Sequence, residues 1–234
     1  MQYLKLIGRW TRSAVLLILL AAVLLQLWYF SWIVWWNWNN PVSTSFMRAQ
    51  LSQLREKNPN LMLQYRWVNY AQISPQLKRA VIAAEDGNFT DHDGVDWDAL
   101  EKAYEKNQKK GKVVAGGSTI TQQLAKNLFL SGDKSYVRKA QEFVITWMLE
   151  LVMSKRRILE LYLNVAEWGE GVFGAEAGAW HHYKTNASKL SAEQASRMAA
   201  MLPRPRFYDK NPGSPYLARY AARIQARMGG AELP

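Results

Sequence analysis

The sequence predicts a mainly α-helical domain carried on a single N-terminal transmembrane helix. Two observations favour this class: a charge-free apolar run near the N-terminus, and apolar residues that recur every three or four positions through most of the remaining chain. A third is that the alternation typical of a strand is clear in only one segment, residues 61–68. The 234 residues suffice for one ordinary domain with a small appendage, and no cysteine is present. Disulfides and thiol nucleophiles are therefore excluded.

The predicted membrane span is residues 13–36, SAVLLILLAAVLLQLWYFSWIVWW. A helix of this length measures roughly 36 Å, enough to cross a bilayer. Lys5, Arg9 and Arg12 precede it without an acid, and tryptophans crowd its far end, which predicts that residues 1–12 are cytoplasmic. A cleaved signal peptide is the alternative, but the run is too long for one and lacks a small-residue cleavage pattern. Most of the protein is then expected outside the cytoplasm.

The exported part is predicted to be basic. The whole chain has a net charge of +11, and the three N-terminal cations leave 27 basic and 19 acidic residues, or +8, for the rest. Such a surface attracts anions. Nucleic acid is not expected as a partner of a membrane-anchored exported domain, whereas anionic headgroups and lipid-linked phosphates lie within reach.

After the span, residues 37–59 are predicted to form a juxtamembrane connector that includes a short charged helix over 48–57. A domain over 60–230 follows. It begins with the strand signal at 61–68, where Leu61, Leu63, Tyr65 and Trp67 alternate with Met62, Gln64 and Arg66.

The first helix of the domain has a clear start and a clear end. Ser74 is placed to cap it and Pro75 to occupy its first position, and Gly87 ends it. Glu85 therefore lies in the last turn, where the helix dipole disfavours a carboxylate and raises its pKa. Taken alone, Glu85 is typical of a solvated surface acid.

The remaining helices are predicted from apolar period and capping residues. They are a polar helix from an Asp96 cap to Gly111, a helix over 118–130, a long periodic run over 137–164, a helix over 191–202 with a Ser191/Gln194 capping box, and a last helix over 215–228.

The segment GKVVAGGST, residues 111–119, is not a nucleotide-binding loop, because Gly117 stands where the P-loop pattern requires lysine. It does lead into a helix that is predicted to begin with Ser118 and Thr119 and to offer free N–H groups to an anion. On that helix Thr119, Gln123 and Lys126 are predicted to share one polar stripe, opposite an apolar face. A solvated helix face would have the same pattern.

Two further groups of polar residues have ordinary interpretations. Arg138 and Glu142 stand four apart, which locally favours a surface ion pair. His92 with Asp93 and Asp96, and the adjacent His181 and His182, lack convincing spacing for zinc. Oxygen ligands for a hard divalent ion stay open.

Five stretches in order resemble the peptidoglycan glycosyltransferases of family 51: EDGNFTDHDG (85–94), GGSTITQQLAKN (116–127), RKAQE (138–142), SKRRILELYLNVAEWGEGVFG (154–174) and MLPRP (201–205). The resemblance covers about residues 60–210, and the single span without a long C-terminal region is similar to the monofunctional members. One departure is Tyr183-Lys184, where an aromatic pair is usual, so no contact is assigned there.

The resemblance implies a lysozyme-like helical fold that polymerises lipid II into glycan strands with inversion and releases undecaprenyl pyrophosphate. It implies that Glu85 is the general base toward the GlcNAc 4-hydroxyl, and that Glu142 orients the pyrophosphate site or holds a divalent cation. Asp86 and His92 would shape the loop around Glu85. The substrate-binding residues that it implies are His92, Ser118, Thr119, Gln123, Lys126, Asn127, Arg138 and Lys155.

The resemblance further implies a location in the bacterial inner membrane with the catalytic domain in the periplasm. Expected partners are lipid II, the growing strand, the membrane and cell-wall synthesis or division proteins. Mg²⁺ or Mn²⁺ is left open, and no organic cofactor is expected. A lysozyme-like hydrolase is the main alternative, but it has little use for a basic stripe suited to pyrophosphate. A non-catalytic wall-synthesis scaffold is the other.

Overall fold

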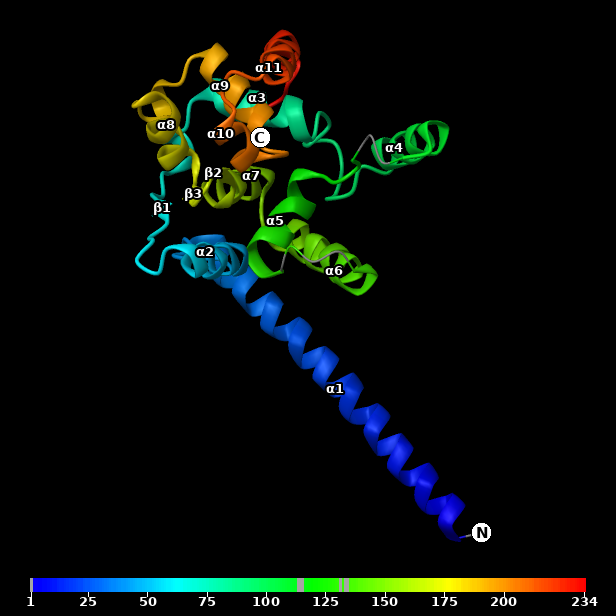
Figure 1. The fold of residues 1–234 in the computed structure, drawn as a ribbon. Helices are drawn as coiled ribbons and strands as arrows, with labels where there is room; N and C mark the ends of the chain where they lie inside the picture. The colour runs from blue at the N-terminus through cyan, green and yellow to red at the C-terminus, as the bar shows by residue number, and fades with distance from the viewer. Residues whose placement is uncertain (1, 113–115, 131, 133–134) are drawn as a thin grey trace. The chain divides into compact units, whose positions relative to one another are not determined.

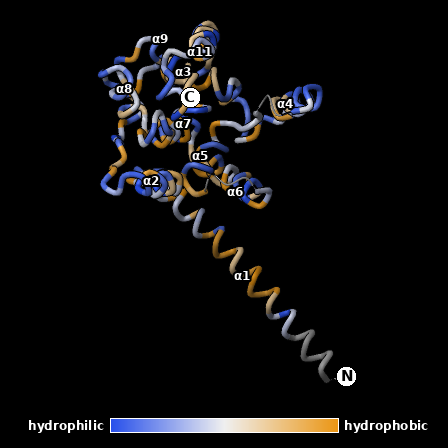
Figure 2. Tube along the Cα trace, viewed as in Figure 1, coloured by the Kyte–Doolittle hydropathy of each residue, from blue (hydrophilic) through white to orange (hydrophobic). Residues whose placement is uncertain are grey.

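The structure is a computed structural model that describes residues 2–112, 116–130, 132 and 135–234 (Figure 1). The chain divides into two compact units, residues 1–39 and 40–234. The first unit is one helix, α1 (Gln2–Trp38), whose stretch Trp10–Trp38 is long and apolar enough to cross a membrane. Figure 2 shows this apolar character along most of its described length.

The second unit is mainly helical, as the sequence predicts. Its helices are α2 (Ser45–Lys57), α3 (Pro75–Glu85), α4 (Trp97–Lys110), α5 (Ile120–Phe129), α6 (Tyr136–Val152), α7 (Lys155–Val165), α8 (Ala175–Tyr183), α9 (Ala192–Met201), α10 (Pro205–Lys210) and α11 (Pro215–Arg227). Short 3₁₀ turns occupy Tyr70–Gln72, Ala187–Lys189 and Met228–Gly230.

The second unit also contains a small three-stranded sheet with the strand order β1-β3-β2. β1 (Gln64–Tyr65) pairs in parallel with β3 (Val172–Phe173), which pairs antiparallel with β2 (Glu167–Gly169). The alternation over 61–68 is present as alternating exposure, but only two of these residues pair as a strand. The prediction of one strand segment was therefore too narrow, because β2 and β3 are short and lie in a glycine-punctuated stretch with no alternation to mark them.

Three of the predicted helix starts are confirmed by their side-chain caps. The Ser74 hydroxyl accepts a hydrogen bond from the Gln76 N–H, and Asp96 accepts one from the Ala99 N–H. Gly111 ends α4 in the left-handed conformation, with φ of 62°. Ser191 and Gln194 form the predicted capping box of α9.

The run over 137–164 is not one helix, which corrects the sequence-based prediction. It divides into α6 and α7, because Met153 adopts an extended conformation and Ser154 caps α7 by accepting from the Arg157 N–H. The apolar period continues across the break, so periodicity alone hides it.

The core of the domain forms around α5, which packs against α6 on one side and α7 on the other. Elsewhere in the domain α9 packs against both α3 and α11. The largest fully buried side chains include Phe89, Tyr162, Trp168 and Phe173. The helix α2 also packs against α5, so residues 40–59 belong to the compact domain and do not stand apart from it.

Candidate active site

Glu85 is the last residue of α3, and its carboxylate is held by a chain of side chains from two other helices. The Gln123 amide Nε2 on α5 donates to Glu85 Oε2 at 2.7 Å. The Tyr162 hydroxyl on α7 donates to Gln123 Oε1 at 2.9 Å, which fixes the amide with its NH₂ group toward Glu85. Glu85 is therefore oriented by the core and is not a solvated surface acid.

The environment of Glu85 favours its protonated form. Burial is the largest influence and raises the pKa, and the negative charge of Asp86 adds to it. The Gln123 hydrogen bond and the charge of Lys126 act in the opposite direction, but the net pKa stays raised. A carboxylate in this state has the enhanced proton affinity that a general base requires.

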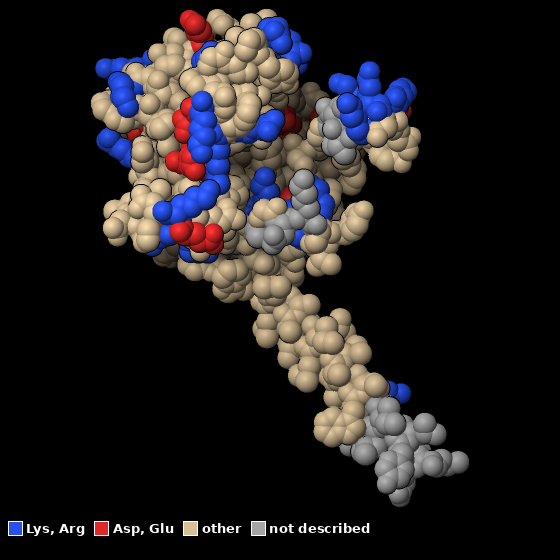
Figure 3. Space-filling view, viewed as in Figure 1, with Lys and Arg blue, Asp and Glu red and all other residues tan. Residues whose placement is uncertain are grey.

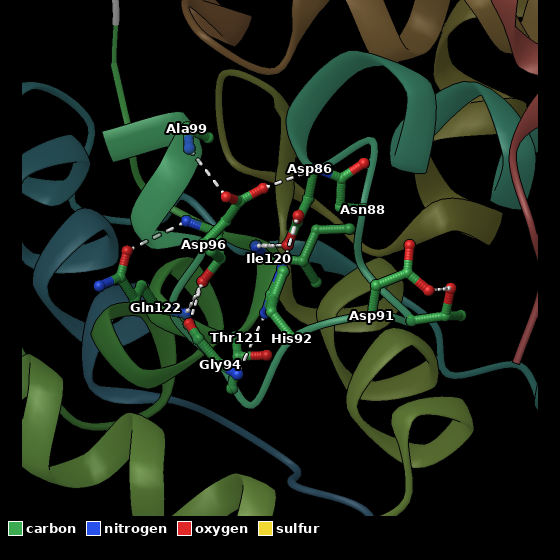
Figure 4. Close-up of polar contacts among 12 residues, drawn as sticks. Asp86, Asn88, Asp91, His92, Gly94, Asp96, Ala99, Ile120, Thr121 and Gln122 are labelled. Carbon is green, nitrogen blue, oxygen red and sulfur yellow. Dashed lines mark hydrogen bonds and ion pairs between the residues drawn. The ribbon is translucent and has the colours of Figure 1, made fainter. Parts of the chain in front are cut away.

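The loop after Glu85 is fixed by hydrogen bonds that converge on Asp86, as Figure 4 shows. The Gly94 N–H donates to His92 Nδ1 at 3.1 Å, so the ring proton lies on Nε2 and points to Asp86 Oδ1 at 2.8 Å. The Ile120 N–H at the start of α5 donates to Asp86 Oδ2 at 3.0 Å. We call Asp86, His92, Gly94 and Thr119 the loop network.

The loop network corrects the prediction of a free anion site at the start of α5. The carboxylate of Asp86 already lies at this helix N-terminus, where the dipole stabilises it. Thr119 is the N-cap and is only 3% exposed: its hydroxyl donates to the Gly94 carbonyl at 2.6 Å and accepts from the Gln122 N–H. Thr119 is therefore absent from the polar stripe, which keeps Gln123 and Lys126.

A second group of polar residues lies where α5 meets α6. Glu142 is 3% exposed, and its Oε2 accepts from the Arg138 guanidinium at 2.5 Å while its Oε1 accepts from the Lys139 ammonium. Lys139 also donates to the Ser118 hydroxyl at 3.3 Å. The interpretation of Arg138 and Glu142 as an ordinary surface pair was wrong, because the carboxylate is buried. We call Lys126, Arg138, Lys139 and Glu142 the cation cluster.

Lys126 is the member of the cation cluster with unsatisfied donors. Within the described part of the chain its ammonium forms no hydrogen bond or ion pair. Burial lowers its pKa most, the charges of Arg138 and Lys139 lower it further, and Glu142 and Glu85 oppose them. Arg138 Nε is likewise buried without a partner among the described residues. Two cationic groups thus carry N–H donors for which the described residues offer no partner.

Two further predicted binding residues lie near but have different surroundings. Lys155 donates to the His92 carbonyl at 2.5 Å and to Glu150 at 2.9 Å, and its ammonium lies 4.8 Å from the centre of the Phe89 ring. It thereby supports the loop after Glu85. Asn127 is 7% exposed on α5. Their contact with substrate stays a prediction.

A cavity of about 260 Å³ lies beside Glu85. It is lined by the end of α3, the start of α4, residues 116–119 and Arg227 of α11. Figure 3 shows basic side chains gathered on the neighbouring helix α4. Sequence reasoning missed Lys139, Tyr162 and Arg227, and only Lys139, inside the RKAQE stretch, had a local signal.

Two groups of side chains have a geometry that could hold a metal ion. Asp86, His92 and Asp96 place one ligand atom each within 4.8 Å of one another, and so do His181, His182 and Asp209. In the first group both oxygens of Asp86 already have partners: Oδ1 contacts the His92 ring, and Oδ2 accepts from the Ile120 N–H. Both Glu142 oxygens accept from cations, so a divalent ion there would compete with Arg138 and Lys139.

Comparison with known proteins agrees with this geometry. The model of the family described as Transglycosylase matches residues 52–229. The chain belongs to the transglycosylase family. The match begins within α2, which supports assigning that helix to the domain.

Curated relatives extend the transglycosylase match over nearly the whole chain. A protein of Herminiimonas arsenicoxydans named biosynthetic peptidoglycan transglycosylase is 64% identical over 220 residues, covering 94% of this chain and 95% of the relative. Proteins of the same name from Janthinobacterium sp. (strain Marseille) and Dechloromonas aromatica are 64% and 54% identical, covering 92% and 99% of this chain and 93% and 100% of the relatives. The lysozyme-like hydrolase is not favoured by these matches.

Proposed function

We propose that this transglycosylase polymerises lipid II with Glu85 as general base. The chain is a peptidoglycan glycosyltransferase by family, and precursors and glycan strands of peptidoglycan are its substrates. The observation that carries the assignment of Glu85 is its carboxylate with a raised pKa, held in a cavity by Gln123 and Tyr162. The base takes the proton of the GlcNAc 4-hydroxyl, which attacks C1 of the terminal MurNAc as the bond to pyrophosphate breaks, with inversion.

The departing lipid pyrophosphate is assigned to the cation cluster. Negative charge accumulates on the leaving group as its bond to C1 breaks, and preorganised donors that meet this charge lower the barrier. Lys126 and Arg138 have the unsatisfied donors that suit this task. Glu142 orients Arg138 and Lys139, which would otherwise repel Lys126 into other rotamers.

We further propose that α1 spans the bacterial inner membrane with its N-terminus in the cytoplasm and the catalytic domain in the periplasm. The support is the basic, acid-free segment before the span and the tryptophans at its other end. Confinement to the membrane concentrates the enzyme with its lipid-linked substrate. Cell-wall synthesis or division proteins are the partners expected there. Removing residues 1–36 should lower turnover on lipid II in bilayers more than in detergent, and equal losses would contradict this role.

The deciding experiment incubates the purified full-length protein with labelled lipid II in detergent. Polymer and undecaprenyl pyrophosphate should appear together, and release of soluble fragments from finished peptidoglycan should not. Release without polymer would indicate the hydrolase instead. The same assay with a chelator and with added Mg²⁺ or Mn²⁺ tests the divalent cation. We propose that side-chain cations provide most of the charge neutralisation, so chelation should reduce polymerisation only partly.

A further inference from the structure

A second cavity, of about 420 Å³, lies among α9, α10 and α11, apart from the residues assigned so far. Its walls carry four aromatic side chains and one arginine: Arg204, Phe207, Tyr208, Tyr216 and Tyr220. We call these five residues the aromatic groove. Its volume lies in the range of about 300–1,000 Å³ that is usual for ligand sites.

Two rings of the aromatic groove are open to solvent, although large aromatic side chains are usually buried. Phe207 is 43% exposed and Tyr216 is 53% exposed. The rings of Tyr216 and Tyr220 lie side by side, with centroids 6.2 Å apart and planes inclined by 37°. Single exposed aromatics need no explanation, but several that line one cavity mark a binding surface.

Cationic groups accompany these rings. The Arg204 guanidinium lies 4.6 Å from the centre of the Phe207 ring, and that of Arg223 lies 5.4 Å from the Tyr220 ring. Among the described residues that line the cavity, none is acidic. The aromatic groove therefore suits a ligand that has flat apolar faces and negative groups.

The aromatic groove adjoins the catalytic residue through Tyr220. The Tyr220 hydroxyl lies 3.4 Å from the carbonyl oxygen of Ala84, the residue before Glu85. Ala84 also lines the cavity that contains Glu85. Tyr220 thus belongs to the wall of one cavity and contacts the wall of the other, so the aromatic groove and the cavity beside Glu85 are neighbours.

We propose that the aromatic groove is a subsite for the glycan strand, which binds N-acetylhexosamine units removed from the sugar that reacts at Glu85. This inference rests on the proposed function, because it assumes that a strand grows there. The C–H faces of pyranose rings pack against aromatic rings such as Phe207 and Tyr216. Arg204 is placed to pair with the carboxylates of the stem peptides. By holding the strand after each transfer, the groove favours another addition over release.

The binding test uses full-length protein in detergent, labelled with fluorotyrosine and titrated with a peptide-free GlcNAc tetramer. Fluorine NMR signals of Tyr216 and Tyr220 are assigned with Tyr216→Phe and Tyr220→Phe. Both signals should shift saturably, whereas that of Tyr104, an exposed tyrosine on α4, should not. Phe207→Ala should weaken the titration about two- to tenfold, the usual range for one aromatic contact. A Tyr216 signal that does not move would overturn the proposal.

The functional test compares strand lengths made from lipid II by wild type, by Phe207→Ala/Tyr216→Ala and by the matched control Tyr104→Ala. Because both groove positions are exposed, the double variant should fold, which its thermal unfolding checks. The length of its strands should fall by a larger factor than its initial rate of lipid II consumption. The control should match wild type in both. Equal strand lengths in all three proteins would contradict the subsite.

These outcomes separate the inference from the proposed function. If the wild type makes no polymer, the proposed function fails, and the titration still decides whether the groove binds the tetramer. If the wild type polymerises but the tetramer leaves Tyr216 unmoved, only the subsite is wrong.

Discussion

The loop network and the cation cluster both adjoin α5, but their polar groups differ in how far the domain satisfies them. In the loop network, both oxygens of Asp86, both ring nitrogens of His92 and the hydroxyl of Thr119 have partners within the domain. In the cation cluster, Lys126 and one nitrogen of Arg138 have none among the described residues. Groups that are satisfied internally position the site, whereas buried donors without partners are available to a ligand.

The sharpest test of this division is Glu85→Gln, which keeps shape and hydrogen bonding but removes the proton acceptor. Polymerisation should fall by about 10²–10⁴-fold, the usual contribution of a general base. Because burial raises the Glu85 pKa in the folded state, ionised Glu85 costs stability at neutral pH. The variant should therefore unfold at a higher temperature than wild type at neutral pH, and the difference should vanish below the pKa of an unfolded glutamate. A normal rate with an intact fold would transfer the role to another residue, Glu142 first.

Next in size are Lys126→Ala and Arg138→Ala, which remove the cations at the leaving group. Each should lower the rate of polymerisation about 10²–10³-fold, as loss of one preorganised charge-stabilising donor does elsewhere. Their stabilities should differ. Lys126 has a lowered pKa and forms no hydrogen bond or ion pair with the described residues, so its loss should not destabilise the fold. Arg138→Ala leaves buried Glu142 with Lys139 alone and should lower the free energy of unfolding. Near wild-type rates for both would reject the pyrophosphate site.

Asp86→Asn tests the loop network, and its effect should fall on stability first. An asparagine side chain has one acceptor oxygen, so it satisfies either the His92 ring N–H or the Ile120 N–H but not both. The unsatisfied donor should cost about 1–3 kcal/mol of unfolding free energy. Urea unfolding measures this, with Asp93→Asn, the same substitution at an exposed aspartate of the same loop, as the control. An unchanged midpoint would show that the loop does not depend on Asp86.

The smallest expected effect is a shift in pH dependence. The rate should fall about tenfold per pH unit below the pKa of Glu85, and this acid limb should lie above the ordinary glutamate range. The charge of Lys126 lowers that pKa, so the limb of Lys126→Ala should move to higher pH. A Lys126→Arg control keeps the charge and should move it less. Profiles of initial rate against pH, measured with lipid II, test this. An acid limb at the same pH in Lys126→Ala and in wild type would show that the charge of Lys126 does not act on Glu85.

Sequence reasoning succeeded where the signal is local. Ser74, Pro75 and Gly87 bound α3 in the sequence and thereby place Glu85 at its end. It failed at the start of α5, where the helix was predicted to begin directly after the glycine-rich loop, at residue 118. The helix begins at Ile120, and the capping box of Thr119 and Gln122 was a signal for this that was not used. It also failed at the division of α6 from α7, where both halves share one apolar period.

The contacts that make the site lie beyond local reasoning. Gln123 and Tyr162 come from different helices, and no spacing in the sequence indicates that one orients the other toward Glu85. The burial of Glu142 depends on how α5 and α6 pack, so its pair with Arg138 has the sequence pattern of an exposed one. The resemblance named Gln123, Arg138 and Glu142 but not Tyr162, and only the fold gives each its partner.

Inhibitors that bind Glu85 in its ionised form and inhibitors that bind it in its protonated form should differ in how their affinity depends on pH. Gln123 donates to Oε2, and a ligand that contacts the other carboxylate oxygen would meet an acceptor when Glu85 is ionised and a donor when it is protonated. A compound that presents an amine there would favour the ionised state and release a proton into solution on binding, so its affinity would rise with pH. A compound that presents a carbonyl would take up a proton and bind best in acid. Calorimetry in buffers of different ionisation enthalpy would therefore sort candidate drugs by how they meet this single side chain.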